Sequence, residues 1–409
     1  MPVLLRISTI LIVFLTLPFP VQAGDDARNT DSTLLTQARE LAKRLTLVDT
    51  HIDLPSLLVR RWYDVSLKDF TGNFDYVRAR AGGLDVPFMS IYISSQMEGS
   101  PKAKERAEQM IAAVRKMASS WPDKFEIVTS PSDIKRKKDS GKILLAMGME
   151  NGAPLLGDIG NLSYFHALGI RYITLAHAKW NHICDASYDP ERHWNGLSPF
   201  GKQVIGEMNQ LGIMVDISHL TDSAAAQAIR LSRAPVIASH SSCRFFTPGF
   251  ERNMSDELIV ALAAKGGVIQ ISFASEFIND SIRVVYANID SAVADSVRRK
   301  GWDQQSDQAR QFKREYLRQN PRPYATVEEV AAHIDHVRRL VGIDFVGIGS
   351  DFDGVGDTLP AGLKDVSDYP NLIAALLKMG YNENEISKVC GGNLLRVWSE
   401  VERVAHEKK

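Results

Sequence analysis

Histidine and carboxylate side chains follow several apolar segments of this sequence. The first segment ends in Asp49-Thr50-His51-Ile52-Asp53. Because side chains alternate along a strand, His51 and Asp53 would lie on one face and offer a nitrogen and an oxygen donor side by side. Glu150 ends a later apolar segment, where a strand would give way to a loop. Taken singly these patterns are weak, since a three-residue HxD string arises by chance and Glu150 could equally start a surface helix.

His219 and His240 each follow a further apolar segment. A lone histidine there is more often a hydrogen-bonded core residue than a ligand, but the joint pattern is harder to explain by chance. Three imidazoles and two carboxylates at one place would be electrostatically strained without a cation. Nitrogen and oxygen donors without a thiolate suit zinc, and also manganese, cobalt or iron. Five protein ligands exceed what one catalytic zinc normally takes, so we predict two ions with Glu150 as the bridging carboxylate.

Asp351, His177 and Arg252 could complete such a site. Asp351 follows the last apolar segment and could carry a proton beside an activated water. His177 could be a ligand or a hydrogen-bond donor to the oxygen that becomes negative during attack. Arg252 could hold a substrate carboxylate through two hydrogen bonds, although a surface salt bridge is the better interpretation of this residue taken alone. Asp353 precedes a glycine and is more simply explained as a turn residue.

The elements that must position these residues are short segments rich in Val, Ile and Leu. We predict strands at 45–50, 87–93, 143–149, 172–175, 213–217, 235–239, 268–272 and 345–349. Helices are predicted at 102–118, 200–211, 222–231, 255–265 and 326–341. Eight buried strands alternating with helices predict an α/β fold of the (β/α)8 TIM-barrel type, whose reactive groups lie at the C-terminal ends of the strands. A doubly wound open sheet is the alternative.

The chain is predicted to have three parts. Residues 1–23 contain one charge, an apolar run and the small-residue pattern Val21-Gln22-Ala23, which is typical of a cleaved secretory signal. A polar leader is predicted at 24–44 and a single catalytic domain at 45–409. The charged stretch 280–322 is interpreted as a solvated helical insertion, with a lid or a dimer contact as weaker alternatives.

The composition limits the classes of protein that this chain can represent. Its 409 residues are 44% hydrophobic and 24% charged, with 48 Lys plus Arg against 49 Asp plus Glu. Such values exclude disorder, collagen-like repeats and a membrane-embedded fold. The net charge of −1 gives no reason to expect nucleic acid or anionic lipid as a partner. The polar C-terminus lacks the hydrophobic tail of a GPI signal, so we expect a secreted or periplasmic protein without a membrane anchor.

The remaining cysteines and histidines receive simpler interpretations. Cys184, Cys243 and Cys390 cannot all pair within one chain, and the first two could form a bridge or stay free. His333 and His336 are three apart on a predicted outer helix, where we expect a solvated face. The sequence has no GxSxG elbow, phosphate-binding glycine loop or HExxH helix, so mechanisms that need those motifs have no residues to use.

Seven motifs in consistent order resemble the membrane (renal) dipeptidases, peptidase family M19 of the amidohydrolase superfamily. The resemblance runs from about Leu45 to Val401. Its motifs are VDTHIDLP at 48–55, GMENG at 148–152, YITLAH at 172–177, DISHL at 216–220, APVIASHSS at 234–242, RNMSD at 252–256 and GSDFDG at 349–354.

This resemblance implies an amidohydrolase-type barrel that holds two zinc ions. His51 and Asp53 match the ligands of the first ion, and His219 and His240 match those of the second. Glu150 matches the bridging carboxylate. His177, Arg252 and Asp351 match positions that contact substrate, and Asp351 also matches the proton shuttle. A homodimer is implied in the same way, as is acceptance of a D-residue at the C-terminal position, and some members open β-lactam rings.

The expected activity is hydrolysis of free dipeptides by an exported enzyme. Water activated by the zinc ions would attack the peptide carbonyl, with Glu150 holding the ions, His177 stabilising the oxyanion and Asp351 passing the proton to the departing amine. Arg252 would bind the free carboxylate. The alternatives are another metal-dependent amidohydrolase, acting on a lactone, a cyclic amide or an amino-acid derivative, and a non-catalytic zinc-dependent binding protein.

Overall fold

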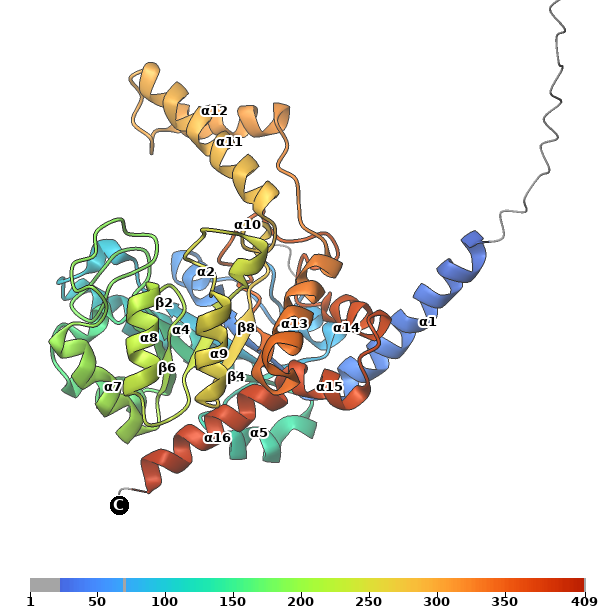
Figure 1. The fold of residues 1–409 in the computed structure, drawn as a ribbon, viewed down its shortest axis with the longest axis horizontal. Helices are drawn as coiled ribbons and strands as arrows, with labels where there is room; N and C mark the ends of the chain where they lie inside the picture. Colours follow the sequence, from blue (N-terminus) through green and yellow to red (C-terminus); the bar gives the residue numbers. More distant parts are fainter. Residues whose placement is uncertain (1–22, 69–70, 408–409) are drawn as a thin grey trace, which may run out of the picture.

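A barrel of parallel strands forms the centre of the protein (Figure 1). The structure is a computed structural model that describes residues 23–68 and 71–407, so the predicted signal peptide lies outside the described residues except for Ala23. The strands are β1 (Leu47–Ile52), β2 (Leu84–Tyr92), β3 (Phe125–Ile127), β4 (Ile143–Glu150), β5 (Ile170–Thr174), β6 (Met214–Asp216), β7 (Ile237–Ser241), β8 (Val268–Ile271) and β9 (Val346–Ile348).

The strands follow one another around the barrel in the order β1-β2-β4-β5-β6-β7-β8-β9, and every pair is parallel. The first and last strands meet just beyond β9, where the Asp351 amide donates to the His51 carbonyl at 3.1 Å and the Asp53 amide donates to the Phe352 carbonyl at 2.9 Å. This closure confirms the (β/α)8 fold and excludes the doubly wound open sheet.

Helices cover the outside of the barrel (Figure 1). Those that begin before residue 170 are α1 (Ala23–Arg44), α2 (Leu54–Arg60), α3 (Tyr76–Gly82), α4 (Lys102–Ser120), α5 (Pro131–Lys137) and α6 (Gly160–Ala167). The later ones are α7 (Pro199–Leu211), α8 (Asp222–Leu231), α9 (Asp256–Ala264), α10 (Ser275–Ile278), α11 (Asp280–Arg299), α12 (Asp307–Gln319), α13 (Val327–Val341), α14 (Tyr369–Lys378), α15 (Glu383–Ser387) and α16 (Asn393–His406).

The half of the barrel at the N-terminal ends of the strands, called the lower half below, is filled with apolar side chains and closed by α16. Trp398 of this helix is buried, and its ring lies 5.2 Å from that of Phe88 on β2. Tyr172 on β5 packs above Phe88, with ring centroids 5.5 Å apart. Gly148 on β4 makes room for it, because a Cβ atom there would lie 2.0 Å from the Tyr172 ring. The packed lower half leaves the C-terminal ends of the strands as the place for chemistry.

Most predicted elements are present, with shifted ends. The strand predicted at 45–50 is β1, which extends to Ile52 and therefore includes His51. The helix predicted at 222–231 has the predicted bounds because Thr221 caps it, accepting a hydrogen bond from the Ala224 amide. The prediction missed β3, a three-residue strand that pairs with β4 outside the barrel order, because so short a run carries little periodicity.

Two segments lie outside the eight βα units. The stretch predicted as a polar leader at 24–44 is helical in α1, and its residues Ala38, Leu41 and Ala42 are buried in the main core cluster. The insertion 280–322 contains α11 and α12, which form an arm that stands away from the barrel (Figure 1). This arm agrees with the predicted helical insertion. Within the described residues, no helix combines the length and the apolar character that a membrane crossing requires.

Candidate metal centre and substrate cavity

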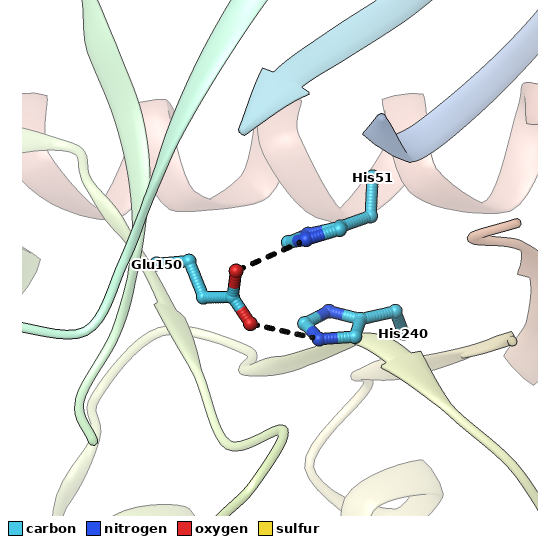
Figure 2. Close-up of side chains that lie close together, drawn as sticks. All are labelled: His51, Glu150 and His240. Carbon is cyan, nitrogen blue, oxygen red and sulfur yellow. Dashed lines mark ion pairs between the residues drawn. The ribbon is translucent and has the colours of Figure 1, made fainter. Parts of the chain in front are cut away.

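The carboxylate of Glu150 lies between imidazoles from several strands at the mouth of the barrel. Figure 2 shows its two oxygens directed at His51 and His240. Oε2 is 3.4 Å from Nε2 of His51, whereas Oε1 is 3.3 Å from Nε2 of His240 and 3.1 Å from Nε2 of His219. Asp53 completes the first group, with Oδ2 3.4 Å from Nε2 of His51. The structure therefore brings all five predicted ligands together.

A buried tyrosine fixes the protonation of His51. The Tyr172 hydroxyl donates its single proton to the Thr50 carbonyl at 3.0 Å and lies 2.9 Å from Nδ1 of His51. Because that proton is already used, Nδ1 of His51 must be the donor in the second contact. Nε2 of a neutral His51 is then left with its lone pair directed at Glu150 and Asp53, which is the state that a metal ligand needs.

A serine and a carboxylate fix His240 in the same way. The Ser239 hydroxyl donates to Oδ2 of Asp216 at 2.5 Å and accepts from Nδ1 of His240 at 2.8 Å. Asp216 is in turn held by the amides of Ser218 and Ser239, which donate to its Oδ1 at 3.0 and 2.8 Å. Nε2 of His240 therefore faces Glu150 without a proton.

The electrostatics of the cluster favour a cation. Burial opposes the charge on Glu150, yet the imidazoles of His51 and His177 hold its pKa well below the usual range. Burial also opposes a proton on His51, but Tyr172, Glu150 and Asp53 together raise its pKa well above the usual value. Burial lowers the pKa of both His219 and His240. The anionic Glu150 carboxylate thus faces neutral imidazoles of His219 and His240 and draws a proton onto His51, so the cluster favours a positive charge at this place.

The donor atoms fall into two groups that share Glu150. Nε2 of His51, Oδ1 of Asp53 and Nδ1 of His219 are buried, and none of them has a hydrogen-bond partner within the described part of the chain. The lone pair of His240 faces a carboxylate oxygen, a contact between two acceptors that a cation would relieve. His51, Asp53 and Oε2 of Glu150 form one donor group, while His219, His240 and Oε1 form the other. Nitrogen and oxygen donors of this kind suit zinc.

Two further predicted residues border these donors. His177 lies with Nε2 3.5 Å from Oε1 of Glu150, and its ring centroid is 4.3 Å from that of His219. Burial lowers the pKa of His177, so its imidazole is neutral near pH 7. Asp351 has a donor oxygen within 4.8 Å of donors on His51 and Asp53, and burial raises its pKa to about 7. An acid with that pKa can give and take a proton near neutral pH.

Arg252 is buried beside the second donor group, so its interpretation as a surface salt bridge is wrong. Only 3% of the residue is exposed. Its Nη1 donates to the Ser241 hydroxyl at 2.9 Å and its Nη2 donates to the His240 carbonyl at 2.7 Å. Among the described residues Arg252 has no carboxylate partner, and its Nε is unpaired. A buried guanidinium held by neutral groups is suited to bind an anionic ligand.

A cavity of about 620 Å³ opens above the donor cluster. Its wall includes Asp53, Glu150, His177, His219 and Asp351 of the predicted site. The other lining residues are Ser56, Arg60, Tyr92, Arg106, Tyr188, Glu276, Phe277, Asp353, Gly354 and Val355. The volume lies in the range of small-molecule sites.

Some predictions about neighbouring residues were wrong. His333 is buried rather than solvated, because its Nδ1 accepts from the Cys243 amide at 3.0 Å and its Nε2 lies 2.9 Å from the Ile278 carbonyl. His336 pairs with Asp256 at 2.8 Å. For Cys184 and Cys243 a bridge and free thiols were both open, and the structure shows both thiols free and buried.

Asp353 has the predicted turn conformation. Its φ is 67°, its amide donates to Oδ1 of Asn73 at 2.9 Å, and its Oδ1 accepts from the Asn73 amide at 2.5 Å. Sequence reasoning did not single out Tyr172, Ser239 or Asp216, although all three stand in the motifs that carry the resemblance. Strand periodicity offers a signal for Tyr172, because a tyrosine among apolar residues of a buried strand needs a hydrogen-bond partner.

Comparisons with known proteins point to one family. A model of the membrane dipeptidase family (peptidase family M19) matches residues 35–409. Dipeptidase 3 of Mus musculus is 33% identical over 384 residues, covering 91% of this chain and 68% of that protein. The crystal structure of the probable dipeptidase PvdM from Pseudomonas aeruginosa has a TM-score of 0.80 and 29% identity, covering 91% of this chain and all of that one.

A further similar solved structure holds a ligand. It is the metallopeptidase from Rhodobacter sphaeroides liganded with a phosphinate mimic of the dipeptide L-Ala-D-Ala, with a TM-score of 0.71 and 25% identity over 87% of this chain and 99% of that one. The family match, the relatives and the barrel together confirm the resemblance that the sequence motifs indicated. The chain belongs to the membrane dipeptidase family, peptidase family M19.

Proposed function

We propose that this protein is an exported dipeptidase that uses two zinc ions, bridged by Glu150, to hydrolyse free dipeptides. The observation that carries the proposal is the division of the donor atoms into two groups around one carboxylate, with a buried Arg252 at their edge that has no carboxylate partner among the described residues. A dinuclear centre alone would suit many hydrolases. A buried guanidinium beside it favours a substrate that carries a carboxylate close to the bond that is cleaved.

Each residue has a role in the proposed reaction. The bound ions supply Lewis acidity, which lowers the pKa of water and polarises the scissile carbonyl. Neutral His177 donates a hydrogen bond to the oxygen that becomes negative during attack. Asp351 takes the proton of the attacking water and delivers it to the departing amine, a role that its raised pKa supports. Arg252 holds the C-terminal carboxylate and so fixes the distance between that group and the scissile bond.

The proposed substrates are short because both ends must be accommodated. A free carboxylate on Arg252 limits the chain to one residue beyond the scissile bond, so tripeptides are poor substrates. We extend the proposal to dipeptides with a C-terminal D-residue, which the phosphinate mimic of L-Ala-D-Ala in the Rhodobacter sphaeroides relative supports. Export is supported by the charge, apolar run and small-residue pattern of residues 1–23.

The test is a substrate panel given to the mature, zinc-loaded protein. It contains L-Ala-L-Ala, L-Ala-D-Ala, a tripeptide, an N-acetylated dipeptide and a dipeptide amide. We expect cleavage of the two free dipeptides and at least 100-fold lower kcat/KM for the amide, which lacks the anionic group that Arg252 binds. Glu150→Gln should abolish the cleavage.

The panel also separates the alternatives. Zinc binding with no dipeptide turnover would favour another amidohydrolase, and equal cleavage of the acid and the amide would remove the role of Arg252. For a non-catalytic binding protein, Asp351→Asn would leave ligand binding intact and no turnover would be found with any substrate. Size-exclusion chromatography with light scattering tests the homodimer, which only the resemblance implies.

A further inference from the structure

Two arginines line the substrate cavity beside the elements that follow β1 and β2. Arg60 is the last residue of α2, which follows β1, and Arg106 lies in the first turns of α4, which follows β2. Both belong to the wall that also contains Glu150 and His177. Tyr92, the last residue of β2, lies next to both His177 and Arg106. Its ring lies 5.0 Å from that of His177, and it lines an adjoining hollow of about 380 Å³ together with Arg106.

Neither guanidinium has an ion-pair partner in the part of the chain that the structure describes. Other arginines of the protein do form close pairs, such as Arg44 with Glu383 at 2.6 Å and Arg338 with Glu385 at 2.7 Å. Arg106 is partly buried, and its pKa is lowered by burial and by the charge of Arg60. Two positive charges that repel each other across a cavity wall are relieved when an anion binds between them.

The topology sets which end of a dipeptide reaches these arginines. Arg252 follows β7, and three strands separate β7 from β2 in either direction around the barrel. Arg106 therefore lies across the mouth from Arg252, and Arg60, which follows the neighbouring β1, is separated from β7 by two strands on its nearer side. When the C-terminal carboxylate binds Arg252 and the scissile carbonyl lies over Glu150, the side chain of the N-terminal residue extends toward β1 and β2.

From this arrangement we propose that Arg60 and Arg106 form a subsite for an acidic side chain on the N-terminal residue of the substrate. The preferred substrates are dipeptides that begin with glutamate or aspartate. The inference rests on the proposed function, since it needs the C-terminal carboxylate on Arg252, and it adds the chemical class of the N-terminal residue.

The test compares Glu-Ala with Gln-Ala, which has the same shape and no side-chain charge, and uses Ala-Ala as the reference. For the wild-type protein at low ionic strength we expect kcat/KM to be about tenfold higher for Glu-Ala than for Gln-Ala, as two partly exposed charge pairs allow. The ratio should fall toward one in Arg60→Gln/Arg106→Gln. It should also fall as salt is added, because exposed charges are screened.

Arg61→Gln is the matched control. Arg61 follows Arg60 directly and is exposed, but it does not line the cavity, so this variant should keep the tenfold ratio. Ala-Glu should gain less over Ala-Gln than Glu-Ala gains over Gln-Ala in the wild-type protein, because its side chain lies away from Arg60 and Arg106. Thermal unfolding shows whether the double variant is folded, and the substrate ratio and salt series of the wild-type protein test the proposal even if it is not.

Three results would overturn the subsite. The first is a Glu-Ala to Gln-Ala ratio near one in the wild-type protein, and the second is an unchanged ratio in the folded double variant. The third is a double variant in which KM rises by the same factor for Ala-Ala and Glu-Ala, which would mean that these arginines bind the C-terminal carboxylate. Hydrolysis of Ala-Ala without the preference refutes the subsite alone, whereas no hydrolysis of any dipeptide refutes the proposed function and the subsite with it.

Discussion

Replacing Tyr172 with phenylalanine removes one hydroxyl that orients a predicted metal ligand. That hydroxyl accepts from Nδ1 of His51 at 2.9 Å and donates to the Thr50 carbonyl at 3.0 Å. Both Tyr172 and His51 are fully buried, so no water replaces either contact. The Tyr172→Phe protein would contain an unpaired N–H and a weakened acceptor in its core. We expect the free energy of unfolding to fall by about 1–3 kcal/mol.

The functional effect of Tyr172→Phe should exceed its structural effect. Without its partner, the His51 imidazole loses both its preferred tautomer and its orientation, and such losses lower metal affinity by about 10–100-fold. Zinc affinity is measured by competition with a chromophoric chelator, and stability by urea denaturation of the metal-free protein.

Tyr381→Phe is the control for this substitution. Tyr381 is also a buried tyrosine, and its hydroxyl donates to Oδ1 of Asp335 on α13 at 3.2 Å; neither residue lines the cavity. The free energy of unfolding of Tyr381→Phe should fall about as much as that of Tyr172→Phe, while its zinc affinity should equal that of the wild-type protein. Equal zinc affinity in Tyr172→Phe and the wild-type protein would refute the assignment of Tyr172 as the residue that orients His51.

Three further predictions concern pH, substrate binding and packing. Burial lowers the pKa of His333 from its ordinary 6.5 to about 4. Its contribution to stability is therefore complete above pH 6.5, and about 3 kcal/mol of it is lost as the pH falls toward 4. Urea denaturation at pH 7.5 and at pH 5 should show that His333→Gln loses less free energy of unfolding on acidification than the wild-type protein does. Arg252→Met should raise KM for Ala-Ala by about 100-fold in steady-state assays, and a KM within twofold of wild type would contradict the clamp. Gly148→Ala should cost about 1–3 kcal/mol in the same denaturation assay, because its methyl group meets the Tyr172 ring, and an unchanged midpoint would contradict that overlap.

The sequence predicted the residues of the site better than it predicted the contacts that hold them in place. His51 and Asp53 could be paired from strand periodicity, and Glu150, His219 and His240 from their places after apolar segments, because the barrel fold brings strand ends together. The contact of Tyr172 with His51 spans 121 residues of sequence, and no local pattern predicts such a distance.

Burial explains two of the wrong interpretations. Arg252 and His333 are polar residues in a loop and on an outer helix, where exposure is the usual expectation. The first is buried because the barrel mouth encloses its loop, and the second because neutral imidazole satisfies both the Cys243 amide and the Ile278 carbonyl. Tertiary packing determined both outcomes, and neither residue's local sequence reports it. The short strand β3 was missed for a related reason, since it depends on pairing with β4.

The most direct test of the account is a zinc titration of the metal-free protein, followed by the rate of L-Ala-L-Ala hydrolysis. Two donor groups that share Glu150 predict a rate that rises and reaches its plateau at two zinc ions per chain. A plateau at one ion would contradict the dinuclear centre, and zinc binding without hydrolysis at any ratio would contradict the dipeptidase function itself.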